Sequence, residues 1–225
     1  MDSLTRRTYV SVIGTLIFVW IFLFIPAWSL SFWQAWIYWG AFSIPVIVIS
    51  LYFLKKNPVF MESRLKAGPT AEKELAQKII QFFLSLFFIA LLVIPGFDYR
   101  LHWSFVPIQL VIGGDILVLL GFWAVHMVFN ENTFASATIQ IHNKQKVIST
   151  GLYKYVRHPM YAGAGILIIG TPLALGSYWA FLPVLGMGVG VVFRLLHEER
   201  YLLQHLPGYK KYCEKVKHHL IPFVW

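Results

Sequence analysis

Four long apolar runs constrain this chain more than any other feature of its sequence. They cover residues 9–28, 32–54, 79–97 and 105–129, and Asp115 is the only acidic residue inside them. A helix needs about 20 mostly apolar residues to cross the hydrocarbon core of a bilayer. The four runs therefore predict four membrane-spanning helices. A cleaved signal peptide is the competing interpretation of the first run, because Arg6 and Arg7 precede it.

The composition agrees with a membrane protein and excludes other classes. Hydrophobic residues make up 58% of the chain and charged residues 13%, whereas soluble domains carry about 25% charged residues. This hydrophobicity also excludes intrinsic disorder. The single cysteine, Cys213, excludes a disulfide framework.

Two shorter apolar runs follow Pro159: residues 160–171, which continue after Pro172 over 173–178, and residues 179–193, with Gly176-Ser177 as the turn. Each is short for a full span, so each requires tilt or local bilayer thinning. Their glycines would allow two helix backbones to approach closely. We therefore predict an all-α, polytopic transmembrane helical bundle of about six membrane helices, the last two forming a short helical hairpin.

The basic residues predict the orientation of the bundle. The formal net charge is +9, and with the N-terminus inside, 18 of the 19 Lys and Arg residues fall on inner segments, leaving only Arg100 outside. This bias places both termini in the cytoplasm. In a membrane protein the excess favours contact with anionic lipid over nucleic acid. For the inner segment 55–78 we expect a solvated loop and a short interfacial helix over 71–78, with Thr70 as its N-cap.

The polar residues divide the chain into two parts. Residues 1–129 are expected to form a transmembrane scaffold of four helices. Residues 130–225 combine the two short membrane helices with motif-rich polar segments, and are expected to form a C-terminal cytosolic pocket.

His158-Pro159 begins one of these motifs. Proline is favoured in the first turn of a helix, which places His158 at the cap beside free backbone N–H groups. Helix N-termini attract carboxylates and phosphates, and Arg157 adds a fixed positive charge. The alternative is an interfacial histidine next to a snorkelling arginine.

A second motif contains Arg194, Glu198 and Glu199 at the inner end of the last apolar run. Ionisable groups at this depth are candidates for function. Arg194 and Glu198 are four residues apart and share one helix face, so an ordinary surface ion pair is the alternative. Acids are rare in this chain, which favours a functional role.

The C-terminal part resembles the isoprenylcysteine carboxyl methyltransferase family, which is grouped with the phospholipid methyltransferases among integral membrane methyltransferases. The resemblance covers about the last 95 residues. It is carried by the run from Gln145 to Tyr161 with Val156-Arg157-His158-Pro159-Met160-Tyr161-x-Gly163, by Arg194-x-x-x-Glu198-Glu199, by Gly208-Tyr209-x-x-Tyr212, and by the terminal Ile221-Pro222-Phe223. Eukaryotic members carry a longer acidic run and more spans.

The resemblance implies S-adenosyl-L-methionine as methyl donor, bound in a cytosolic pocket from which a tunnel opens sideways into the membrane for a lipid or lipid-anchored substrate. Arg194 matches the residue that approaches the substrate carboxylate. The positions that match the family's cofactor contacts are Gln145, Lys146, Val147, Ile148, Tyr153, His158, Pro159, Met160, Tyr161 and Glu198.

The chemistry of methyl transfer leaves the acceptor open. A carboxylate is already a nucleophile at pH 7, and Arg194 would position it. An amine must first lose a proton, and Glu199 is then the candidate base. The alternatives to a protein-S-isoprenylcysteine O-methyltransferase are a phospholipid N-methyltransferase and an NADPH-dependent membrane reductase of the sterol-reductase type. We expect no metal site, because His218-His219 lacks partners at ligand spacing. The sequence leaves the oligomeric state and the cellular membrane open.

Overall fold

The computed structural model describes residues 2–72, 74–135, 137–139 and 145–225. Every regular element in these ranges is helical, which confirms the predicted all-α class. In chain order the elements are α1 (Ser3–Ala27), α2 (Trp33–Lys56), α3 (Pro58–Leu65), the 3-10 helix η1 (Pro69–Ala71), α4 (Leu75–Leu101), α5 (Ile108–Glu131), the 3-10 helix η2 (Gly151–Lys154), α6 (Pro159–Ala174), α7 (Phe181–His205) and α8 (Tyr209–Lys215).

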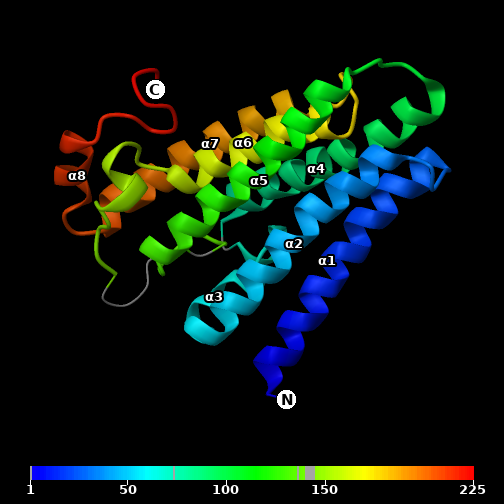
Figure 1. The fold of residues 1–225 in the computed structure, drawn as a ribbon. Coiled ribbons are helices and arrows are strands. Elements are labelled where there is room, and N and C mark those ends of the chain that lie inside the picture. Colours follow the sequence, from blue (N-terminus) through cyan, green and yellow to red (C-terminus); the bar gives the residue numbers. More distant parts are fainter. Residues whose placement is uncertain (1, 73, 136, 140–144) are drawn as a thin grey trace.

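The long helices form a polytopic membrane bundle. By length and composition, α1, α2, α4, α5 and α7 are each able to cross a membrane, and α6 is a shorter apolar helix of 16 residues. The chain is therefore an integral membrane protein. The links α1–α2, α4–α5 and α6–α7 lie at one end of the bundle, whereas both termini, α3 and α8 lie at the other (Figure 1).

Glycines bring α5 and α6 into close backbone contact. A Cβ atom added to Gly114 would lie 2.2 Å from the backbone nitrogen of Ala174, and one added to Gly121 would lie 2.7 Å from Leu167. On α6, a Cβ atom on Gly170 would lie 2.7 Å from the carbonyl oxygen of Gly114. Small residues that allow helices to approach are typical of membrane interfaces. Gly163 and Gly170 of α6 thus pack against α5 rather than against α7.

We expect Gly114→Ala to destabilise the bundle by about 1–3 kcal/mol, because the added methyl group overpacks the α5–α6 contact. The measurement is the thermal unfolding midpoint of purified protein in detergent micelles. The neighbouring Gly113→Ala is the matched control, since a Cβ atom there meets nothing within 4 Å. Equal midpoints for the two variants would contradict the packing role of Gly114.

The inner segment 55–78 differs from its prediction. The helix here is α3, which starts at Pro58 and is capped by Asn57, whose Oδ1 accepts from the backbone N–H of Phe60 at 3.0 Å. Residues 69–71 form only η1, and α4 starts at Leu75. The expected cap at Thr70 was therefore wrong. Glu72, which was expected on the interfacial helix, lies between η1 and α4 and is only 4% exposed.

The C-terminal tail returns to the start of α6. The backbone N–H of Arg157 donates to the carbonyl oxygen of His218 at 2.9 Å, and that of His158 donates to the carbonyl oxygen of His219 at 3.0 Å. The ring of His219 stacks on Trp225, with centroids 4.6 Å apart. The tail therefore braces the helix start that presents His158.

Candidate functional site

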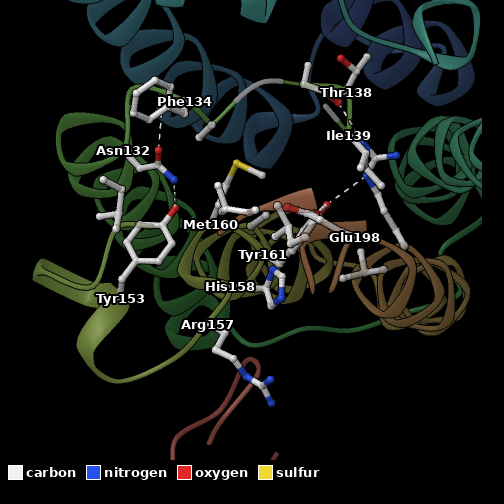
Figure 2. A pocket seen from close by; sticks show the side chains of 18 of the residues that line it. Asn132, Phe134, Thr138, Ile139, Tyr153, Arg157, His158, Met160, Tyr161 and Glu198 are labelled. Atoms are coloured by element: carbon white, nitrogen blue, oxygen red, sulfur yellow. Dashed lines mark hydrogen bonds between the residues drawn. The ribbon is translucent and has the colours of Figure 1, made fainter. Parts of the chain in front are cut away.

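A cavity of about 390 Å³ lies at the end of the bundle that carries α3 and α8. Its described walls come from α3, α4, α6, α7 and α8, from η2, and from the chain between α5 and η2. Figure 2 shows side chains from several of these segments facing a common space. Parts of the chain that are far apart in sequence therefore build one site.

Most of the site residues expected from the sequence lie in this cavity. Tyr153, His158, Tyr161 and Glu198 surround it (Figure 2). Pro159 and Glu199 are absent from its described lining. The predicted residues that do line it are Gln145, Lys146, Val147, Ile148, Tyr153, His158, Met160, Tyr161, Arg194 and Glu198.

Three tyrosines form one wall. The side-chain amide of Asn132 donates to the Tyr153 hydroxyl at 2.8 Å, and the Tyr212 hydroxyl donates to the Tyr153 carbonyl oxygen at 2.8 Å. Burial raises the pKa of Tyr153 to about 12, so its phenol is neutral at pH 7. The hydroxyl of Tyr209 is buried and has no hydrogen-bond partner among the described residues. That orphaned group is suited to a ligand atom.

Glu198 provides the only carboxylate among the described lining residues. Its Oε2 accepts a hydrogen bond from the Tyr161 hydroxyl at 2.7 Å. It forms no ion pair with a described residue; in particular, the predicted partner Arg194 pairs elsewhere. Glu198 therefore leaves a negative charge available to a cationic or hydroxyl-bearing ligand.

Glu199 lies in a separate cluster beside the cavity. Its carboxylate is 3.0 Å from Arg157, 3.3 Å from the Nε2 atom of His158 and 3.0 Å from that of His219. Burial lowers the pKa of His219, although Glu199 opposes the shift. The cluster joins α7, the start of α6 and the C-terminal tail. Glu199 therefore contacts His158 directly, and His158 in turn lines the cavity.

Arg194 is held on every side by protein groups. Its Nε donates to the Tyr161 hydroxyl at 3.1 Å and its Nη1 to Gln77 Oε1 at 2.9 Å. Its Nη2 donates to Glu72 Oε1 at 2.8 Å and to the Ala137 carbonyl oxygen at 3.0 Å. Both members of the Glu72–Arg194 pair are buried, with exposed side-chain fractions of 2% and 6%.

Sequence reasoning missed Glu72 and Gln77. Both lie about 120 positions before Arg194, in the segment 71–78 that the sequence predicts to be an interfacial helix. No local pattern indicates such a contact. The one available signal was the rarity of acidic residues in a chain that has only ten of them.

The fold and cavity define a polytopic membrane protein with an internal polar site at one end of its bundle. The family model described as phospholipid methyltransferase matches residues 109–208, a range that contains α5, η2, α6 and α7. Over these residues, the match confirms the resemblance to membrane methyltransferases that the motifs predicted. A comparison with curated proteins gave no match.

Proposed function

We propose that this protein is an S-adenosylmethionine-dependent methyltransferase that methylates a lipidic or lipid-anchored acceptor. The observation that carries the proposal is the shared cavity of Tyr153, His158, Tyr161 and Glu198. All four lie inside the segment matched by the methyltransferase family model. The excess of basic residues on inner segments supports a cytoplasmic position for this cavity and for both termini.

The residues present fit such a cofactor. The unpaired carboxylate of Glu198 is suited to an ammonium group or to ribose hydroxyls. The orphaned hydroxyl of Tyr209 offers one further hydrogen bond. Gln145, Lys146, Val147 and Ile148 form a strip along the cavity wall. When bound, S-adenosylmethionine supplies an electrophilic methyl group carried on a sulfonium.

The protein's part in this reaction is to hold two reactants in line. Correct placement of two reactants contributes up to about 7–11 kcal/mol in favourable cases. The network through Tyr161 joins Glu198 to Arg194 and so fixes this wall of the cavity.

The acceptor group is the finer part of the proposal. A carboxylate, as in the isoprenylcysteine carboxyl methyltransferases, is nucleophilic without a base. An amine, as in phospholipid N-methylation, must first lose a proton, and Glu199 was the sequence candidate for removing it. Glu199 is absent from the described lining and contacts two residues that belong to it, Arg157 and His158. A carboxylate acceptor needs no base, and this favours it over an amine.

Thermal unfolding of purified protein tests the cofactor. We expect S-adenosylhomocysteine at 100 times its Kd to add about 2.7 kcal/mol to the free energy of unfolding. NADPH at the same concentration should leave the midpoint unchanged. Stabilisation by NADPH alone would reject the methyltransferase and support the reductase.

A further inference from the structure

Two of the four Lys and Arg residues in the described lining of the cavity are neutralised by acids from outside that lining. Arg194 is paired with Glu72, and Arg157 is paired with Glu199 at 3.0 Å. Lys146 is exposed to solvent. Arg64, on α3, lines the cavity and forms no ion pair with any described carboxylate.

The contacts of Arg64 leave most of its donors free. Its Nη1 donates to the Ala135 carbonyl oxygen at 3.3 Å and lies 4.0 Å from the sulfur of Met160. Its guanidinium stands 4.8 Å from the centroid of the Phe129 ring. Nε and Nη2 form no hydrogen bond with a described residue. The aromatic ring and the carbonyl hold the fork in place but do not balance its charge.

The surroundings of Arg64 disfavour its positive charge. Burial lowers the pKa of Arg64 to about 10, and the neighbouring Arg194 also disfavours its charged form. The side chain is nevertheless protonated at pH 7. A partly buried guanidinium whose Nε and Nη2 donors have no partner among the described residues is a strong receptor for an oxyanion, because the fork matches two oxygens at once.

The position of Arg64 points to the acceptor rather than the cofactor. It lies on α3, which lines the cavity together with Gly68 and with Gln81 and Leu84 of α4. The cofactor strip 145–148 and the tyrosine wall are contributed by other segments, after α5. Negative Glu198 and positive Arg64 are thus two separate unpaired charges of one site.

We propose that Arg64 binds an oxyanion on the headgroup of the lipid acceptor. This inference rests on the proposed function. It adds a residue that binds the acceptor and that lies outside the segment matched by the family model. The oxyanion is either a carboxylate, which is then itself methylated, or a phosphate that anchors a headgroup methylated elsewhere. Arg194, whose nitrogens are all engaged, positions the cavity wall and is not the oxyanion receptor.

Three amphiphiles with the same 16-carbon chain test this role: palmitate, hexadecyl phosphate and hexadecanol. Their affinities are measured for protein saturated with S-adenosylhomocysteine in neutral detergent. We expect the wild-type protein to bind at least one anion about tenfold more tightly than the alcohol. Which anion binds more tightly distinguishes the carboxylate from the phosphate. Lack of preference in the wild-type protein overturns the proposal without any variant.

Substitutions then locate the preference. Arg64→Gln should abolish the tenfold difference, Arg64→Lys should retain part of it, and Lys66→Gln is the control, because Lys66 is exposed on the same segment. An Arg64→Gln protein that keeps the preference overturns the assignment. So does a tenfold loss of S-adenosylhomocysteine affinity with the anion preference intact, since Arg64 would then hold the cofactor. Failure of the wild-type protein to bind S-adenosylhomocysteine instead rejects the proposed function and is read separately.

Discussion

Glu199→Gln is expected to lower the free energy of unfolding by about 3 kcal/mol, because removal of one member of a buried ion cluster leaves the others uncompensated. Arg157, His158 and His219 all face this carboxylate. For a chain of this size the loss corresponds to a fall of about 6–12 °C in the melting temperature. The C-terminal tail should also detach from the start of α6, so proteolysis after residue 216 should accelerate.

Glu214→Gln is the matched control, since Glu214 is exposed on α8 and has no ion pair among the described residues. Its melting temperature and tail cleavage should equal those of the unmodified protein. A Glu199→Gln protein with unchanged stability and abolished turnover would contradict the bracing role and support the role of a catalytic base.

The second large effect concerns the cofactor. Glu198→Gln should weaken S-adenosylhomocysteine binding by about 10–100-fold, the equivalent of one lost charge-assisted hydrogen bond of about 1.5–3 kcal/mol. The unliganded protein should melt near its normal temperature, because the Tyr161 hydroxyl is the one hydrogen-bond partner of Glu198 among the described residues. Isothermal titration in detergent measures the affinity.

Glu74→Gln provides the comparison for a charge change near the same end of the bundle. Glu74 pairs with His197 at 2.7 Å on the surface, with half of its side chain exposed, and cofactor affinity should not respond. If Glu198→Gln lowered the free energy of unfolding of the unliganded protein by as much as it weakened the free energy of cofactor binding, Glu198 would be structural.

The sequence predicted the membrane helices and the main residues around the cavity because these are local signals. An uncharged run of 20 residues leaves few alternatives to a span. The motif around His158 and the pair Arg194 and Glu198 each lie on one continuous segment. Their meeting in one cavity followed from the family resemblance, and the division at residue 129 stays a prediction.

Contacts between distant segments could not be predicted in the same way. Glu72 neutralises Arg194, and Arg64 reaches Met160, yet each pair is separated by more than 90 positions. A single sequence carries no periodicity that records such pairing. The helix predicted over 71–78 is an example: propensity near Thr70 suggested a cap, whereas α4 starts only at Leu75 and Glu72 is buried against Arg194.

The Glu72–Arg194 pair has a consequence for protein engineering. The motif-bearing helices cannot be grafted onto an unrelated scaffold as a self-sufficient cassette, because α7 would bring a buried cation whose counter-charge stays behind in the donor. A transplant must carry residues 58–84 together with the C-terminal half. The first half of the chain therefore supplies residues that the site needs, in addition to holding it in the membrane.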